Sequence, residues 1–324
     1  WGCIPTKALL KSAQVFEYIK HASDYGITVK GAEADFSAVI ARSRGVADSM
    51  SKGVQFLMKK NKIDVIMGFG KIQPGKKVEV TDADGKKTVY EGKNIMIATG
   101  ARARALPNVP IDGEKVIEYR KAMSLAKRPD SMVIIGSGAI GVEFAYVYAA
   151  MGTKVTIVEF LPNIVPVEDE DVSKELAKQY KKMGIEILTS SSVESVDTKG
   201  KGCKVSIKTP TGNTEIQCDI VLSAAGVICN LENIGLEEVG IIVDKGRIPV
   251  NAWYETNMPG YYAIGDVTPG PALAHVASAE GIICVEKIAG HKTEALDYSN
   301  IPGCTYCTPE IASVGMTEKK AKEA

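Results

Sequence analysis

The sequence predicts an α/β protein built around a parallel sheet, and three observations support this prediction. From Met132 onward, short apolar strands alternate with helical segments, and the order strand, helix, strand implies parallel pairing with right-handed crossovers. Apolar strands run directly into a glycine at 94–100, 132–138 and 261–266. The 324 residues are 45% hydrophobic and 24% charged, which is enough for two or three domains with a substantial core.

The elements before Met132 are predicted in chain order. Residues 7–20 place apolar side chains on one face of a helix directly after Pro5 and Thr6, so Cys3 lies at or just before a helix N-terminus. The other elements are an amphipathic helix at 36–60, a strand at 64–72, a hairpin at 76–91 and a buried strand at 94–100. Prolines make 101–131 the first candidate linker.

The elements after Met132 follow the alternating pattern. Strands are predicted at 132–138, 154–160 and 186–190, with helices at 140–151 and 169–183. A meander of strands follows at 193–222, with CKVSIKT at 203–209 as one of its strands, then a strand at 261–266 and a helix at 273–289. The tail from Ile301 begins a new segment.

Composition limits the classes of partner. Lys and Arg total 39 and Asp and Glu total 39, so electrostatics favours neither nucleic acid nor an anionic membrane. No stretch approaches the roughly 18 consecutive apolar residues of a membrane-spanning helix, and no signal peptide is indicated, which favours the cytoplasm or an organelle matrix. The seven scattered cysteines argue against a secreted disulfide framework and for reduced thiols with one redox-active position.

The strongest motif is the glycine-rich turn Gly136-Ser137-Gly138-Ala139-Ile140-Gly141, which lies between a strand and a helix. Its glycines permit a tight turn, close approach of the backbone to a pyrophosphate, and close packing of helix on strand. The helix N-terminus offers N–H groups to the phosphates. Glu159 ends the next strand, where its carboxylate can bind ribose hydroxyls and would repel a 2′-phosphate. The motif therefore predicts NAD rather than NADP.

Five motifs together resemble the pyridine nucleotide-disulfide oxidoreductases, and among them the dihydrolipoamide dehydrogenases. They are WGCIPTKALL at 1–10, IATG at 97–100, Gly136–Glu143, YAIGD at 262–266 and LAH at 273–275. The resemblance runs essentially end to end. It implies two Rossmann-like domains, an FAD-binding domain interrupted by an NAD-binding domain, followed by the start of an α+β dimerisation domain. The implied boundaries are 1–125 (FAD, first part), 126–246 (NAD), 247–300 (FAD, second part) and 301–324 (interface).

The resemblance also implies an activity. Protein-bound dihydrolipoamide is oxidised to lipoamide, and its electrons pass through a cysteine pair and FAD to NAD. Cys3 corresponds to the flavin-side cysteine of that pair, Lys7 approaches the reactive flavin nitrogen, and Glu143 pairs with Lys7. The implied partners are lipoyl domains of 2-oxo acid dehydrogenase or glycine cleavage complexes, and a second copy of the chain in a homodimer. Without the resemblance, Cys3 would be a core thiol and Lys7 a solvated helix residue.

Further cofactor contacts are implied by position in the motifs. Those for FAD are Lys7, Gly70, Thr99, Gly100, Ala101, Asp266, Ala272, Leu273, Ala274 and His275. Those for NAD are Gly136, Ser137, Gly138, Ala139, Ile140, Gly141, Val142, Glu143, Glu159, Val193 and Gly226. Taken singly, Asp266 could equally be a helix cap. The arginine often found soon after the glycine at position 226 is lacking, which weakens the NAD contact expected there.

Other family features are expected outside the chain. The first strand of the family, with its own glycine motif for FAD, would precede Trp1, as would the disulfide partner of Cys3. The interface histidine that acts as general base in the family would follow Ala324. We therefore expect the chain by itself to be a fragment that is colourless and inactive toward lipoamide.

Several alternatives stay open from the sequence. A mercuric or glutathione-type reductase would share Cys3 and Lys7, although the glutathione type would need a basic NADP site. A non-catalytic NAD-binding core is the alternative outside enzymes. The Cys304 and Cys307 spacing is typical of redox or zinc sites, but strand alternation places the thiols on opposite faces, and no metal site is predicted. None of the three histidines is taken as the general base: His275 belongs to the segment expected to face FAD, and His21 and His291 are interpreted as structural.

Overall fold

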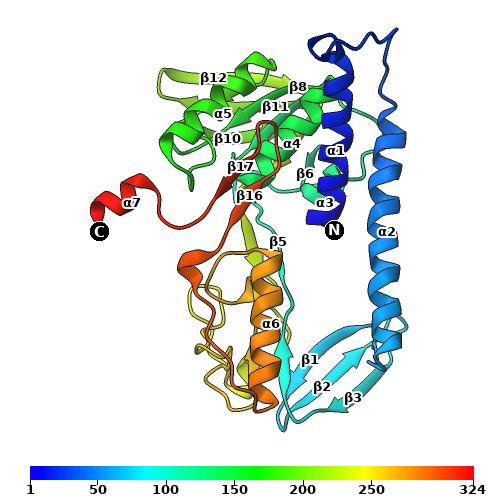
Figure 1. The fold of residues 1–324 in the computed structure, drawn as a ribbon, viewed down its shortest axis with the longest axis vertical. Coiled ribbons are helices and arrows are strands. Elements are labelled where there is room, and N and C mark those ends of the chain that lie inside the picture. The colour runs from blue at the N-terminus through cyan, green and yellow to red at the C-terminus, as the bar shows by residue number, and fades with distance from the viewer. The chain divides into compact units, whose positions relative to one another are not determined.

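The chain divides into two compact units in the computed structural model, which describes all residues from Trp1 to Ala324. Unit 1 combines 1–57, 103–226 and 304–324, and unit 2 combines 58–102 and 227–303. Each unit is thus assembled from segments that are far apart in the sequence, as the change of colour along the ribbon shows (Figure 1). The domain boundaries after residues 125, 246 and 300 stay a prediction.

A five-stranded parallel sheet forms the centre of unit 1. Its strands, in spatial order, are β6 (Val116–Ile117), β13 (Ile220–Ser223), β7 (Ser131–Ile135), β8 (Lys154–Val158) and β9 (Glu186–Leu188). Parallel sheets are covered on both faces, so their strands are apolar almost throughout. Four of the five residues in β7 and in β8 are buried. The parallel sheet predicted from the alternation after Met132 is confirmed.

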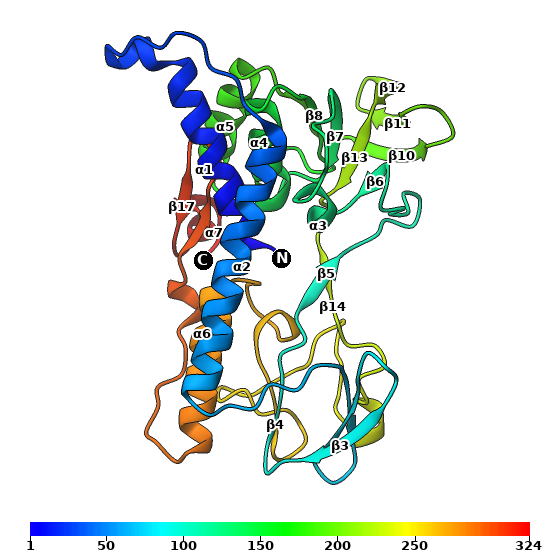
Figure 2. The same cartoon turned by 90° about the vertical axis from the view of Figure 1, so that its right-hand side faces the viewer.

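Helices cover one face of this sheet. Successive side chains in a strand point to opposite faces, and Met132, Ile134 and Ile157 pack into the core that the helices share. The helices concerned are α1 (Cys3–Lys20), α4 (Ala139–Ala150) and α5 (Glu170–Lys182), with the short α3 (Tyr119–Ala122) nearby. Nine of the 12 residues in α4 are buried, as expected for a helix that is apolar all round. Figure 2 shows α1 running beside α4.

An antiparallel meander covers the other face of the sheet. It consists of β10 (Ser192–Asp197), β11 (Cys203–Thr209) and β12 (Gly212–Cys218). Val133, Ile135 and Val158, which alternate with the helix-facing residues, pack here against Val205 and Ile207. Each central strand therefore contributes side chains to both cores of unit 1, because its successive residues point to opposite faces of the sheet.

The rest of unit 1 consists of the chain ends. Helix α1 is followed by the 3-10 turn η1 (Ala22–Tyr25) and by the long helix α2 (Phe36–Lys60), whose last turn extends beyond the unit. At the C-terminal end, β16 (Gly303–Thr305) pairs with β17 (Ile311–Ser313), and α7 (Glu318–Glu323) follows. The predicted helix at 36–60 is confirmed, and the predicted helix at 7–20 begins one turn earlier, at Cys3.

Unit 2 contains small sheets and one longer helix around its own core. The strands β1 (Phe69–Gln73), β2 (Lys77–Thr81) and β3 (Lys87–Glu91) form an antiparallel sheet. β4 (Ile95–Ile97) pairs with β15 (Tyr261–Ala263), and β5 (Ala101–Ala103) pairs with β14 (Val227–Cys229). The remaining elements are η2 (Glu237–Val239), η3 (Gly265–Val267), α6 (Ala274–Ile288) and η4 (Tyr298–Asn300). The predicted hairpin at 76–91 is confirmed.

Two predictions of local structure are wrong. The stretch 101–131, predicted to be a linker, contains β5, β6 and α3, and β6 joins the parallel sheet as an edge strand. Its prolines lie between these short elements rather than within them. The strand predicted at 64–72 begins only at Phe69, where pairing with β2 starts. No helix of the chain is both long and apolar enough to span a membrane.

Candidate functional site

The glycine-rich turn joins β7 to α4 at the carboxyl edge of the parallel sheet. Gly136 has φ of 97°, a left-handed conformation that favours glycine, and a Cβ there would lie 2.6 Å from the carbonyl oxygen of Ala224. A Cβ on Gly141 would collide with the carbonyl oxygen of Gly136. Gly138, in contrast, faces open space, with no atom within 4 Å of its Cβ position. The first and third glycines are therefore needed for packing, and the second leaves room for a ligand.

The N-terminus of α4 is available to an anion. Gly138 is the N-cap residue and provides no side-chain cap, so the first N–H groups of the helix are not satisfied by a capping side chain. Such N–H groups and the helix dipole favour negative charge. Together with the open space at Gly138, this arrangement fits a dinucleotide pyrophosphate.

Glu159 lies beside this turn but faces the protein. Its Oε2 accepts hydrogen bonds from the backbone N (2.8 Å) and the Oγ (2.6 Å) of Ser137, and its Oε1 accepts one from the backbone N of Leu161 at 2.8 Å. Both Glu159 and Ser137 are buried. The carboxylate therefore holds the glycine-rich turn in place. Its contact with a ribose stays a prediction, and it would require the carboxylate to share or exchange these donors.

The other residues expected at NAD occupy different surroundings. Val142 lies within α4, where its carbonyl accepts a hydrogen bond from the hydroxyl of Tyr180 at 2.7 Å. Val193 is buried in the core beneath the meander, and its carbonyl accepts a hydrogen bond from Asn108. Gly226 has φ of 100° and accepts a hydrogen bond from the backbone N of Arg104. Only their backbone groups are polar, so any contact with a dinucleotide there would be through the main chain.

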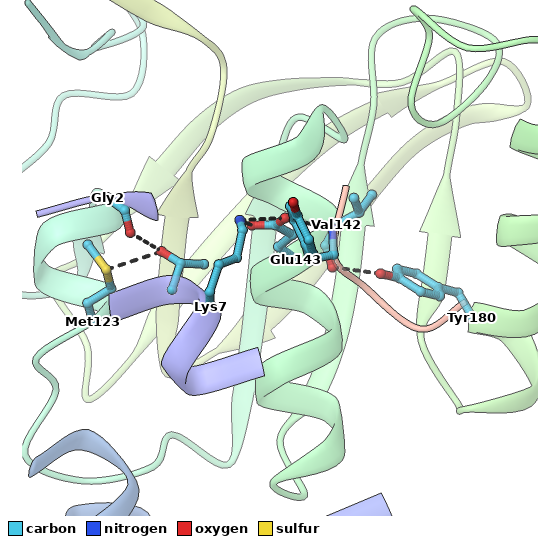
Figure 3. Close-up of polar contacts among 8 residues, drawn as sticks. Gly2, Lys7, Met123, Val142, Glu143 and Tyr180 are labelled. Atoms are coloured by element: carbon cyan, nitrogen blue, oxygen red, sulfur yellow. Dashed lines mark hydrogen bonds and ion pairs between the residues drawn. The ribbon is translucent and has the colours of Figure 1, made fainter. Parts of the chain in front are cut away.

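The best-defined polar contact among the candidate residues is the ion pair between Lys7 on α1 and Glu143 on α4 (Figure 3). The Lys7 Nζ lies 2.9 Å from Oε1 and 2.8 Å from Oε2 of Glu143. The Glu143 side chain is only 6% exposed, whereas that of Lys7 is 36% exposed. The ion pair that the resemblance implies is thus present, with the carboxylate buried and the ammonium group partly open to solvent.

The start of α1 positions Cys3. Gly2, the N-cap residue, has φ of 131°, and its carbonyl accepts a hydrogen bond from the Thr6 Oγ1 at 2.6 Å. The same hydroxyl lies 3.3 Å from the Sδ of Met123 (Figure 3). Cys3 is the first helical residue, exposed and with a free thiol.

Tyr306 completes the surroundings of the ion pair and was not predicted from the sequence. Its backbone N donates a hydrogen bond to Oε1 of Glu143 at 2.8 Å, and the Lys7 Nζ lies 4.7 Å from the centre of its ring. The second contact has the geometry of a cation–π interaction. Tyr306 stands between the two cysteines of the tail, a segment for which the sequence indicates no packing partner.

Cys304 and Cys307 do not face a common point. Cys304 is exposed on β16, whereas Cys307 is fully buried and donates toward the carbonyl of Pro309. Burial raises the pKa of the Cys307 thiol to about 11, which keeps it protonated at neutral pH. The expectation that strand alternation turns these two thiols to opposite faces stays a prediction, because β16 ends at Thr305, before Cys307.

In unit 2, the candidate residues Thr99 and Gly100 form a turn with Asn230. The Thr99 Oγ1 donates to the carbonyl of Asn230 at 2.7 Å, and the Asn230 side chain donates back to the carbonyl of Thr99 at 2.9 Å. Gly100 has φ of 68°, and its carbonyl accepts a hydrogen bond from the backbone N of Asn230. Ala101 then begins β5. The turn is rigid and presents main-chain groups.

Asp266 lies in η3, directly after β15. Helix α6 has Leu273 as its N-cap residue, so Asp266 does not cap that helix. The turn is held by Glu280 of α6, whose buried carboxylate accepts hydrogen bonds from the backbone N of Gly265 and from the hydroxyl of Tyr298, both at 2.6 Å. Sequence reasoning missed Glu280, because a single glutamate within a helical pattern carries no local signal. The side chain of Asp266 is only partly buried and is not used for capping, which fits a hydroxylated ligand.

The remaining residues expected at FAD also lie in unit 2. Ala272, Leu273, Ala274 and His275 form the start of α6, where His275 Nε2 lies 3.0 Å from the carbonyl of Pro302. Gly70 is exposed on β1 opposite Val80. Their roles stay predictions.

The chain matches known proteins over almost its whole length. The family model of the pyridine nucleotide-disulphide oxidoreductases matches residues 1–281. A dihydrolipoyl dehydrogenase from Rhizobium etli is 44% identical, over 100% of this chain and 71% of the relative. A second, from Zymomonas mobilis, is 45% identical, over 100% of this chain and 70% of the relative.

A solved structure has the same fold. The crystal structure of LpdA from Mycobacterium tuberculosis superimposes with a TM-score of 0.91 at 27% sequence identity. The superposition covers 99% of this chain and 70% of that chain. The likeness therefore includes both compact units.

Proposed function

The chain belongs to the pyridine nucleotide-disulphide oxidoreductase family, and we propose that it carries out the chemistry of a dihydrolipoamide dehydrogenase. In this reaction protein-bound dihydrolipoamide is oxidised to lipoamide and NAD is reduced, through FAD and a redox-active cysteine pair. The relatives named above support this reading over a mercuric or glutathione-type reductase and over a non-catalytic NAD-binding core.

The observation that carries the proposal is the ion pair one helical turn after Cys3. Residues Cys3 and Lys7 are four apart on α1 and therefore lie on the same side of the helix. Glu143, the partner of Lys7, lies in the first turns of α4, which begins at the glycine-rich turn. One pair of packed helices thus links a thiol, a fixed ammonium group and a dinucleotide-binding turn within unit 1.

We assign a separate task to each of these groups. Cys3, at the helix N-terminus, supplies the flavin-side thiol of the redox-active pair. Lys7 has three N–H donors, and the two carboxylate oxygens of Glu143 occupy two of them, which leaves one for a flavin nitrogen. Glu143 holds the ammonium group in position. Tyr306 restricts both side chains through its backbone N and its ring.

The residues of the glycine-rich turn are proposed to bind NAD. Gly138 admits the pyrophosphate, the N-terminus of α4 faces it, and Glu159 selects a ribose without a 2′-phosphate. FAD, when bound, supplies two-electron transfer between the thiols and the nicotinamide. In unit 2, the turn at Thr99 and Gly100, the carboxylate of Asp266 and the start of α6 are the groups that we propose to hold it.

The proposal extends to partners and compartment. Relatives of this name imply a role in 2-oxo acid dehydrogenase complexes. We propose lipoyl domains of such complexes, or of the glycine cleavage complex, as the substrate carriers, and a homodimer as the working assembly. We further propose the cytoplasm, or an organelle matrix, as the compartment.

Cys3→Ser in the holoenzyme tests the proposal. Reduction of NAD by dihydrolipoamide is expected to fall on the order of 10³-fold or more, because the sulfur that passes electrons to the flavin is lost. NADH binding is expected to stay unchanged, because the glycine-rich turn is untouched. The matched control is Cys284→Ser, which removes a buried thiol of unit 2.

The choice of substrate is tested in parallel with reduced glutathione in place of dihydrolipoamide. If glutathione supported faster NAD reduction than dihydrolipoamide, the lipoamide assignment would be wrong while the family assignment would stand. If Cys3→Ser retained full activity, the assignment of the redox cysteine would be wrong.

A further inference from the structure

Unit 1 contains a cavity that the proposed function does not use. It has a volume of about 710 Å³ and lies along β8, β9 and β12. The first residues of three parallel strands, Ser131, Lys154 and Glu186, contribute to its lining. These residues mark the amino edge of the sheet, whereas the glycine-rich turn follows the carboxyl end of β7. Cys218, the last residue of β12, also lines the cavity.

Cys218 faces a second thiol across the meander. It pairs directly with Cys203, the first residue of β11, in the antiparallel register. Directly opposite residues in such a pair have Cα atoms about 4.5–5.5 Å apart, and disulfides span Cα distances of about 4.4–6.8 Å. Both thiols are free and buried. The backbone spacing of the two strands is therefore already that of a disulfide.

The surroundings make the two thiols unequal. A hydrogen bond from the Cys218 thiol, aided by the positive charge of Lys115, lowers the pKa of Cys203 in spite of its burial. The same hydrogen bond, together with burial, raises the pKa of Cys218. The carbonyl oxygens of Lys115 and Asp219 each lie 3.8 Å from the Cys203 sulfur. The two thiols are thus in hydrogen-bond contact, as a pair that forms a disulfide requires.

We propose that Cys203 and Cys218 form a second redox site, which hydrogen peroxide oxidises to a cross-strand disulfide. One sulfur of the pair, as a thiolate, attacks one peroxide oxygen and breaks the O–O bond, giving a sulfenic acid and, with one proton, water. The other sulfur then attacks the sulfenic sulfur, the S–O bond breaks, and a second water leaves with the proton of that second thiol. In total two thiols and one peroxide give one disulfide and two waters, with two electrons passing from sulfur to oxygen.

This site is independent of the proposed lipoamide chemistry. Cys3 lies on α1, whereas the pair belongs to the meander that covers the opposite face of the sheet. The cavity beside Cys218 gives a small oxidant a route to the pair, and Lys154 and Glu186 make that route polar. Lipoamide on a carrier domain is a far larger reactant than hydrogen peroxide, so the two sites differ in what can reach them.

Peptide mapping after peroxide treatment tests the proposal. Cleavage after Lys201, Lys204, Lys208 and Lys245 places Cys203 in the peptide 202–204 and Cys218 in the peptide 209–245. The chain treated with hydrogen peroxide is expected to yield these two peptides joined by a disulfide, and a dithiol reductant is expected to separate them. The melting temperature of the oxidised chain is expected to rise by roughly 5 °C, because the link closes a short loop.

Two variants serve as matched controls. The peptide 209–245 also contains Cys229, so Cys229→Ala is expected to retain the linked product and Cys218→Ala to abolish it. Linkage through Cys229, or oxidation of the treated chain at other cysteines while Cys203 and Cys218 stay reduced, would overturn the proposal. The main readout uses the unmodified sequence, so it does not depend on the folding of any variant. Activity toward dihydrolipoamide is not part of the readout, and failure here would leave the proposed function untouched.

Discussion

At the scale of single residues, the candidate site depends on a buried carboxylate that accepts hydrogen bonds from several N–H groups. Glu143 is buried, and three N–H groups reach it, two from the ammonium group of Lys7 and one from the backbone of Tyr306. A buried carboxylate is costly unless it is paired in this way. The ion pair therefore stabilises the packing of α1 on α4 as well as serving the proposed chemistry.

Replacement of Lys7 by alanine is expected to lower the free energy of unfolding by about 2 kcal/mol. Removing one partner of a buried ion pair costs about 3–5 kcal/mol, and the partial exposure of Lys7 reduces that figure. Urea unfolding at neutral pH measures it. The control is Lys11→Ala on the same helix, whose ammonium group makes a solvent-exposed hydrogen bond to Gln14; this change should cost less than about 0.5 kcal/mol. Equal losses in both variants would argue against a structural role for the pair.

The three glycines of the turn are expected to respond differently to alanine. Gly138 has φ of −65° and open space at its Cβ position, so Gly138→Ala should fold normally. The new methyl group would occupy the space assigned to the pyrophosphate and weaken NADH binding by about tenfold, or about 1.4 kcal/mol. NADH fluorescence titration and thermal melting measure the two effects.

Gly141→Ala provides the contrasting case. Its Cβ would collide with the Gly136 carbonyl, so the backbone must shift and the free energy of unfolding should fall by about 1–3 kcal/mol. If Gly141→Ala left stability unchanged, or if Gly138→Ala lost stability rather than affinity, the roles assigned to these glycines would be wrong.

Some of these residues could be predicted from the sequence and others could not. The glycine-rich turn and Glu159 follow from a local pattern of strand, turn and helix. Lys7 and Glu143 were linked only by resemblance, because 136 positions separate them. Tyr306 and Glu280 were not predicted, because a single tyrosine or glutamate produces no periodic pattern in the sequence. Their roles depend on the backbone N–H groups and side chains that they contact in the folded chain.

At the scale of elements, helix α4 explains how the site is kept rigid. Its tyrosines Tyr146 and Tyr148 are buried, and Tyr148 donates a hydrogen bond to the carbonyl of Ala122 at 2.6 Å. Tyr180 of α5 is equally buried and donates to the carbonyl of Val142. Burial raises the pKa of Tyr148 and of Tyr180 above the usual value, because a phenolate would be poorly solvated there. Deprotonation of either phenol would therefore lower the stability of the helix layer.

Alkaline solution is therefore expected to destabilise unit 1. Above pH of about 10 the tyrosines of the unfolded chain lose protons, whereas Tyr148 and Tyr180 keep theirs in the folded state. The unfolded state then binds fewer protons, so the free energy of unfolding falls as the pH rises. Each tyrosine contributes a slope of up to about 1.4 kcal/mol per pH unit. Denaturant unfolding between pH 8 and about 11 measures this slope.

Tyr180→Phe tests the origin of the slope. It is expected to cost about 1 kcal/mol at neutral pH, through the lost hydrogen bond, and to make the alkaline decline shallower. Tyr25→Phe, at a residue that is 66% exposed, should change neither quantity. An unchanged slope in Tyr180→Phe would assign the alkaline effect to other groups.

Elements with strong periodicity were predicted well, and short ones were not. The 25-residue helix α2 and the strand β11 have the predicted bounds, because each contains enough residues to show its period. The strand β6 has two residues and was hidden in the proposed linker at 101–131. This strand forms because its backbone pairs with β13, and the local sequence does not indicate that pairing.

At the scale of the whole molecule, each compact unit combines segments from distant parts of the chain. The glycine-rich turn, the ion pair and the Cys203–Cys218 pair all belong to unit 1, and Thr99, Asp266 and the start of α6 belong to unit 2. This distribution makes it possible to follow dinucleotide binding separately in each unit.

NADH is expected to stabilise unit 1 selectively. At a concentration 100-fold above its Kd, a ligand that binds only the folded state adds about 2.7 kcal/mol. Hydrogen exchange should therefore slow in β7 and α4, with no change in β1, β2 and β3 of unit 2. NADPH at the same concentration should protect less, because Glu159 would repel its 2′-phosphate. Equal protection by both dinucleotides would refute the assignment of Glu159, and protection confined to unit 2 would refute the assignment of the turn.

The sequence alone determined the α/β class, the position of the dinucleotide-binding turn and the expectation of a redox cysteine at a helix N-terminus. These features depend on residues that are close together in the sequence, so their periodicity and backbone requirements can be recognised from the sequence alone. Only the tertiary structure decided that α1 packs on α4 and so brings Lys7 to Glu143, that Tyr306 joins them, and that Glu159 faces Ser137. It also placed Cys203 opposite Cys218. These contacts depend on strand register and on the burial of whole faces, which are settled only when distant segments pack together.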